Sequence, residues 1–74
     1  MKVDVEVKFT DKVDLALVGG KENVLVTYDK DYCEDFDDVI DCVEAEIYKK
    51  YGFAFHYNAD FTIENETEIR DNFS

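Results

Sequence analysis

The stretch that decides the fold runs from Asp29 to Gly52 and reads DKDYCEDFDDVIDCVEAEIYKKYG. Its apolar residues recur at steps of three and four, which is the spacing of one face of an α-helix. On a helix they form a stripe ~120° wide, about what a helix needs to cover a core. The stripe consists of Tyr32, Phe36, Val39, Ile40, Val43, Ile47 and Tyr51. The pattern therefore predicts one long amphipathic helix.

Both ends of this helix carry the expected signals. Asp29 or Asp31 can cap the N-terminus, and the acids at 34–38 favour the positive end of the helix dipole. Lys49 and Lys50 follow at the negative end, and Gly52 fits the position just past the last turn.

The other side of the helix is almost entirely carboxylate. Seven acids between positions 34 and 46 would span ~18 Å of helix axis, or one charge per ~2.6 Å. Duplex DNA carries one charge per ~1.7 Å along its axis and one per ~3.4 Å on each strand. We take these seven residues as the candidate partner-binding surface: Glu34, Asp35, Asp37, Asp38, Asp41, Glu44 and Glu46.

A plain solvated face is the alternative explanation for these acids. Carboxylates in the first turns stabilise a helix, which accounts for the acids up to Asp38. It does not account for Asp41, Glu44 and Glu46, which lie beyond the first two turns. Acid pairs one turn apart also destabilise a helix, so their number favours a binding role.

Before the helix, three segments alternate between apolar and polar residues, as half-buried strands do. They cover residues 2–10, 13–17 and 24–28. Thr10-Asp11-Lys12 is expected to form a tight turn, and Gly19-Gly20 supplies the turn of a hairpin. The sequence predicts an antiparallel meander of three strands here.

After the helix comes the longest alternation in the chain, over residues 53–64. It predicts either one bent strand or a hairpin that turns at 58–60. Residues 65–74 carry a capping pattern, Asn65 and Glu68, which predicts a short terminal helix. The expected fold is a single α+β domain over residues 1–74, in the order β-β-β-α-β, with the acidic helix on one sheet face.

The composition limits the classes of partner that the protein can bind. Nineteen acids and eight bases give 74 residues a net charge of −11. This charge repels nucleic acid and anionic membranes and attracts basic surfaces. No apolar run approaches the ~20 residues of a membrane span.

The two cysteines, Cys33 and Cys42, are nine residues apart. On one continuous helix they would lie on opposite faces, ~13 Å apart along the axis, and could not form a disulfide. Two free thiols without a secretion signal indicate a reducing cytoplasm.

No catalytic or metal-binding motif is present. The segment from Asp29 fails as an EF-hand, because Cys33 and Glu34 occupy a ligand position and the glycine position. The single histidine, His56, lies on the polar side of the last predicted strand, and the single serine is Ser74. We expect no enzymatic activity, no metal and no cofactor.

A small, compact, very acidic chain with an acid-lined helix resembles the phage-encoded inhibitors that imitate nucleic acid, the anti-CRISPR and anti-restriction proteins. The resemblance rests on residues 29–46, on charge and on size. It implies a stoichiometric inhibitor that occupies the nucleic-acid groove of a basic nuclease in the host cytoplasm, and that binds neither nucleic acid nor membrane. An acidic immunity protein or antitoxin is a close alternative. A structural or adaptor module, either monomeric or dimerised through a sheet edge, is the other.

Overall fold

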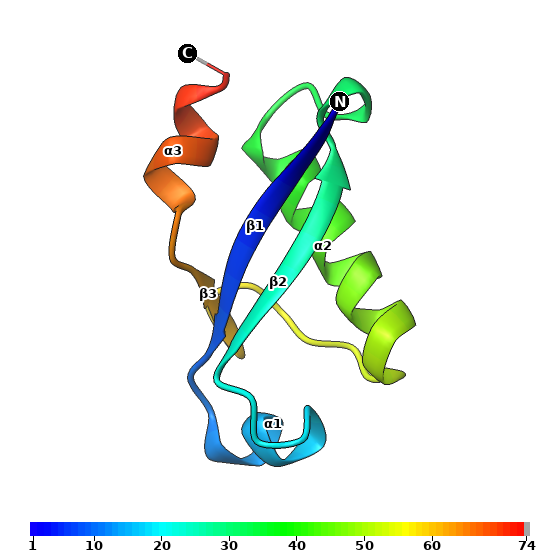
Figure 1. Cartoon of the computed structure of the whole chain (residues 1–74), viewed down its shortest axis with the longest axis vertical. Helices are drawn as coiled ribbons and strands as arrows, with labels where there is room; N and C mark the ends of the chain where they lie inside the picture. Colours follow the sequence, from blue (N-terminus) through cyan, green and yellow to red (C-terminus); the bar gives the residue numbers. More distant parts are fainter. Residues whose placement is uncertain (74) are drawn as a thin grey trace.

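A three-stranded antiparallel sheet in the order β2-β1-β3 forms the centre of the computed structural model, which describes residues 1–73. Helices cover one of its faces and one of its ends (Figure 1), so the predicted α+β class is confirmed. The elements are β1 (Lys2–Phe9), α1 (Lys12–Leu17), β2 (Asn23–Asp29), a 3₁₀ turn (Lys30–Tyr32), α2 (Phe36–Tyr51), β3 (Phe61–Ile63) and α3 (Glu66–Asp71).

Strands β1 and β2 form as the alternation predicts, and their inward residues are buried. The Phe9 N–H donates to the Glu22 carbonyl, and the Lys30 N–H donates to the Met1 carbonyl. Even-numbered residues of β2 therefore bond to β1. Because β2 has no second neighbour in the sheet, the backbone groups of Leu25 and Thr27 point to an open edge.

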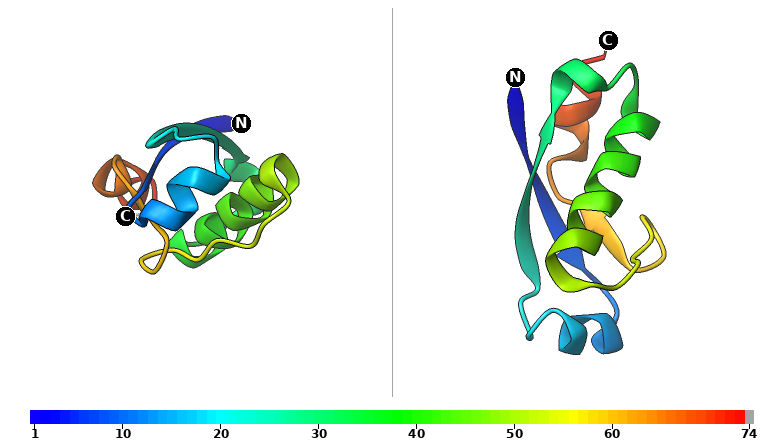
Figure 2. Two further views of the ribbon diagram at one scale, coloured as in Figure 1. Left: turned by 90° about the horizontal axis from the view of Figure 1, so that it is seen from below. Right: turned by 90° about the vertical axis from the view of Figure 1, so that its right-hand side faces the viewer.

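Helix α2 provides the main packing face, and its buried residues are Phe36, Val39, Val43 and Ile47. Figure 2 shows this helix on one side of the β1–β2 ribbon, with the other side of the ribbon open. Gly52 ends the helix in the left-handed conformation at φ 79°, and its N–H donates to the Tyr48 carbonyl. The predicted apolar stripe is correct over this span.

The helix starts at Phe36, four residues later than an N-cap at Asp31 predicts and six later than one at Asp29. Asp29 ends β2, and its side chain accepts the Asp31 N–H to start the 3₁₀ turn. Asp35 then caps α2 by accepting the Asp38 N–H at 3.0 Å. Tyr32, placed by periodicity in the apolar stripe, is instead 81% exposed. Local hydrogen bonds from aspartate side chains interrupt the helix here.

The predicted strand at 13–17 is wrong, because these residues form α1. Asp11 accepts the N–H groups of Val13 and Asp14, which caps a helix where a turn was expected. Val13 is 69% exposed, while Val18 is buried. Gly19 and Gly20 do adopt positive φ as expected, but they lead from a helix into β2 and not from strand to strand. The β-β-β start of the predicted order is thus β-α-β.

The single long strand predicted at 53–64 is also wrong. Only Phe61–Ile63 pairs with β1, and the chain turns at 58–60, the alternative position. Asn58 has φ 68°, and the Asp60 side chain accepts the His56 N–H at 2.7 Å. Phe55 is buried as the alternation predicts, but it packs on the Phe9 ring outside any strand, with centroids 5.2 Å apart. Aromatic packing and the Asp60 turn therefore replace strand pairing.

Helix α3 confirms the predicted terminal helix within the described residues; Ser74 lies outside them. Asn65 occupies the N-cap position but makes no capping bond. Its side chain instead accepts the Glu6 N–H and donates to the Asp4 carbonyl. The predicted capping box is wrong for this reason, since the amide extends the hydrogen bonding of β1.

The cysteines are not held apart. Cys33 lies between the 3₁₀ turn and α2, outside the helix that carries Cys42. Their Sγ atoms are 3.8 Å apart and both residues are half-buried. The expectation that they lie on opposite helix faces is wrong, because it assumed a helix that includes residue 33.

We predict that Phe36→Ala lowers the free energy of unfolding by about 3–5 kcal/mol, because it empties a buried aromatic site. Phe36 is 7% exposed and packs against the Tyr57 ring, and the Arg70 guanidinium lies 4.0 Å from its centroid. Urea denaturation measures the loss. Asp37→Asn, one residue along and exposed, should change stability by less than about 0.5 kcal/mol. Equal losses in the two variants would contradict the helix register.

Asp14 is a buried acid in α1, and its Oδ2 accepts no hydrogen bond within residues 1–73. Burial is the main cause that raises the pKa of Asp14 from 3.8 to about 6, and the neighbouring carboxyls of Asp60 and Asp11 add to it. When protonated, Asp14 can donate to the Asp60 carboxyl. When ionised, it faces a second carboxylate.

This pair predicts a pH dependence of stability. Between pH ~4 and ~6 the native state retains a proton that the unfolded chain has released, so stability falls as the pH rises through this window. Asp14→Asn should flatten that slope in denaturation curves at several pH values. Asp37→Asn serves as the exposed control and should keep the wild-type slope. An unchanged slope in Asp14→Asn would show that Asp14 titrates normally.

Candidate acidic binding surface

The seven predicted acids lie on α2 and directly before it. Glu34 and Asp35 precede the helix, and the other five are within it. None of the seven is buried. Between positions 29 and 48 the chain carries nine acids and one lysine, so this segment holds −8 of the total charge of −11. The structure thus places the predicted residues along α2 and the turn before it; five are exposed, while Asp38 and Glu44 are half-buried.

Two of the seven acids cap the helix. The Asp35 side chain accepts the Asp38 N–H at 3.0 Å, and the Asp38 side chain accepts the Glu34 N–H at 2.9 Å. This reciprocal arrangement satisfies two donors at the helix start, as a capping box does. Asp35 and Asp38 therefore have a structural role that does not require a partner.

Glu44 holds the segment that follows the helix. Its Oε2 accepts the Tyr57 N–H at 3.0 Å and lies 3.9 Å from His56 Nδ1. Burial is the main cause that raises the pKa of the Glu44 carboxyl, while the nearby His56 lowers it. Glu44 thus fastens residues 53–60 to the middle of α2. His56 itself is exposed, as expected.

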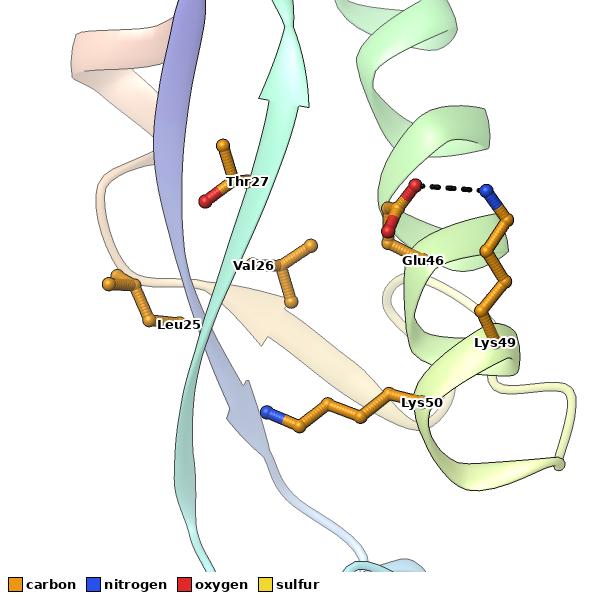
Figure 3. A pocket seen from close by; sticks show the side chains of 6 residues that line it. All are labelled: Leu25, Val26, Thr27, Glu46, Lys49 and Lys50. Carbon is orange, nitrogen blue, oxygen red and sulfur yellow. Dashed lines mark hydrogen bonds and ion pairs between the residues drawn. The ribbon is translucent and has the colours of Figure 1, made fainter.

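Glu46 marks the end of the acidic surface. Its Oε1 accepts a hydrogen bond from Lys49 Nζ at 3.3 Å. Figure 3 shows this pair at a shallow pocket between β2 and α2, with Val26 directed toward the helix and Lys50 reaching across to the strand. The two lysines make this end of α2 basic, so the acidic surface occupies the N-terminal and central part of the helix.

Three acids have no such contacts. Within residues 1–73, the side chains of Glu34, Asp37 and Asp41 take part in no ion pair and no hydrogen bond. All three are exposed. Asp37 and Asp41 are one helical turn apart, so their side chains are neighbours on the helix surface. We refer to these three residues as the free acids.

The described part of the chain offers little else for chemistry. No three His, Cys, Asp or Glu side chains within residues 1–73 form a group that could hold a metal ion. Over the same residues, no helix combines the length and the apolar character needed to span a bilayer.

Comparisons with protein-family models, with curated proteins and with solved structures give no match to this chain. The fold and the placement of side chains are therefore the basis for any functional inference.

Sequence reasoning missed two contacts around this surface. The bond from Tyr57 to Glu44 joins residues 13 apart, and no periodicity reports such a contact. The approach of Asp14 to Asp60 links two segments that were both expected to be strands. Of the four residues in these contacts, only Asp14 had a sequence pattern that could have indicated its position. It lies four residues before the apolar Val18 and so shares a helix face with it.

We predict that Glu44→Ala loosens residues 53–60 while leaving α2 formed. Removing the acceptor leaves the Tyr57 N–H without its partner, so exchange of that amide should accelerate about tenfold. Glu44→Gln, which keeps an acceptor oxygen, should exchange nearly as slowly as wild type. Hydrogen exchange followed by NMR measures both variants. An unchanged Tyr57 rate in Glu44→Ala would show that this bond does not hold the loop.

Proposed function

We propose that this protein is a stoichiometric inhibitor that imitates nucleic acid, and that its acidic surface enters the nucleic-acid-binding groove of a basic partner. A host defence nuclease, either a CRISPR effector or a restriction enzyme, is the partner class that fits, and the host cytoplasm is the place of action. The observation that carries the proposal is the concentration of nine acids and one lysine in residues 29–48.

The charge spacing supports imitation of a phosphate backbone. Five carboxylates lie on α2 between Asp37 and Glu46, a rise of about 14 Å, or one charge per ~2.7 Å. That value still lies between the ~1.7 Å of the duplex and the ~3.4 Å of one strand. The later start of the helix therefore leaves the charge density almost unchanged.

The rigidity of the surface adds to this support. Helix α2 is capped at both ends, and four of its residues are buried in the core. The helix backbone that carries the carboxylates is fixed before any partner arrives, and a pre-organised backbone loses less entropy on binding. The free acids make no ion pair within residues 1–73. A basic groove can therefore bind them without breaking an existing ion pair.

Charge reversal at the free acids tests the proposal. The triple variant Glu34→Lys, Asp37→Lys, Asp41→Lys changes the net charge by six, and it spares the caps and the Glu44 contact. It should lower affinity for a sensitive nuclease about 100-fold or more. DNA cleavage by a guide-loaded CRISPR effector and by a restriction endonuclease, each with and without the protein, provides the measurement. Wild-type inhibition should weaken with added salt and with excess duplex DNA.

A matched control reverses three charges elsewhere. Glu6, Glu22 and Glu64 surround Lys8 on the open face of the sheet, and changing all three to Lys also alters the charge by six. This control should inhibit as wild type does once circular dichroism confirms both folds. Full inhibition by the folded free-acid variant would remove the acidic surface from the mechanism. An equal loss of inhibition in both variants would show that inhibition depends only on the net charge of the protein.

A further inference from the structure

The two thiols form a site that the proposed function does not use. Cys42 lies in the second turn of α2, and Cys33 lies in extended backbone just before the helix, at φ −116° and ψ 126°. Their Sγ atoms are 3.8 Å apart, and Cys33 Sγ lies 3.7 Å from the Asp29 carbonyl, to which it donates. A disulfide requires the sulfurs to approach to ~2.05 Å. A shift of less than about 2 Å at the non-helical Cys33 would close that gap.

Both cysteines are half-buried, but only Cys42 lines a surface pocket. A surface pocket between β2, the 3₁₀ turn and α2 is lined by Cys42 together with Lys2 and Lys49, and Cys33 is not part of its lining. A small reagent therefore meets Cys42 first. The two lysines offset the charges of Asp29 and Glu46, which line the same pocket.

We propose that Cys33 and Cys42 are a reversible dithiol–disulfide site that exchanges with small disulfides such as oxidised glutathione. The Cys42 thiolate attacks one sulfur of the reagent, which breaks the reagent's S–S bond, forms a mixed disulfide and releases one reduced glutathione. Cys33 then attacks the Cys42 sulfur, which forms the internal bond and releases the second reduced glutathione. Two electrons and both thiol protons leave on the two glutathione molecules.

The environment of Cys33 fits the second, resolving role. Burial, followed by the neighbouring Cys42 thiol, raises the pKa of Cys33 to about 11. Cys33 is therefore a poor first nucleophile, because the thiolate is the attacking species. Once Cys42 carries the mixed disulfide, the electrophilic sulfur lies within reach of Cys33, and proximity compensates for its low thiolate fraction.

The internal bond would join the residue that follows the 3₁₀ turn to the second turn of α2. It would close a loop that contains Glu34 and Asp35. It would constrain the unfolded chain and so favour the native state. The site stands on the thiol geometry alone, and it is independent of whether the acidic surface binds a nuclease.

Equilibration of the full chain with a series of oxidised-to-reduced glutathione ratios tests the site. Acid quenching, alkylation of free thiols and intact mass measurement give the fraction of each species. The native chain should convert to a monomeric internal disulfide at a glutathione ratio at least about tenfold more reducing than the same chain unfolded in urea. Retention of both thiols by the native chain, where the unfolded chain is already oxidised, would overturn the proposal. Dominant intermolecular disulfides would overturn it as well.

Single variants test the order of attack. Cys33→Ser should stop at a glutathione adduct on Cys42, while Cys42→Ser should react much more slowly, because the raised pKa of Cys33 leaves little thiolate to attack. The reverse pattern would overturn the assignment of Cys42 as the attacking thiol. Circular dichroism of both variants confirms the fold, and the wild-type equilibrium decides the existence of the site without either of them.

Discussion

The packing of the apolar face of α2 against one face of the sheet is the constraint on which the rest of the structure depends. Val39, Val43 and Ile47 on α2 are fully buried, and so are Val5 and Val7 on β1. This contact fixes the rotation of α2 about its own axis. Once that rotation is set, the carboxylates between the buried positions must point to solvent or lie at the edge of the helix–sheet contact. The acidic surface is therefore a geometric consequence of the core, and any partner it binds meets a surface that folding has already positioned.

Patterns that repeat over many residues were sufficient to predict the parts of the fold that bury apolar area. The alternation in β1 and β2 and the three-four spacing in α2 each reflect one buried face, so periodicity locates them. Gly52 was predictable for a different reason, since few residues other than glycine adopt positive φ at a helix end. The exposure of Asp37, Asp41 and Glu46 followed from the same helical spacing.

The errors share a physical cause, which is the hydrogen bonding of short polar side chains to nearby backbone. Asp11 starts a helix in place of a turn, Asp29 diverts the chain into a 3₁₀ turn, and Asp60 closes the turn after residue 57. Each bond is local and specific, so apolar periodicity does not report it. The proximity of Cys33 to Cys42 follows from the second of these diversions. In the candidate site, Asp38 makes a local capping bond and Glu44 a tertiary contact, and apolar spacing reports neither.

The net charge also affects what can happen at the open edge of β2. A strand with unpaired N–H and C=O groups at Leu25 and Thr27 is a template on which another β-strand could grow, and its inward residues are strongly β-forming. Nothing in residues 1–73 covers that edge with a further strand. At −11, however, two copies repel each other long before their edges meet. Charge repulsion between copies thus protects an edge that the fold leaves uncovered, and high salt would weaken that protection by screening the charges.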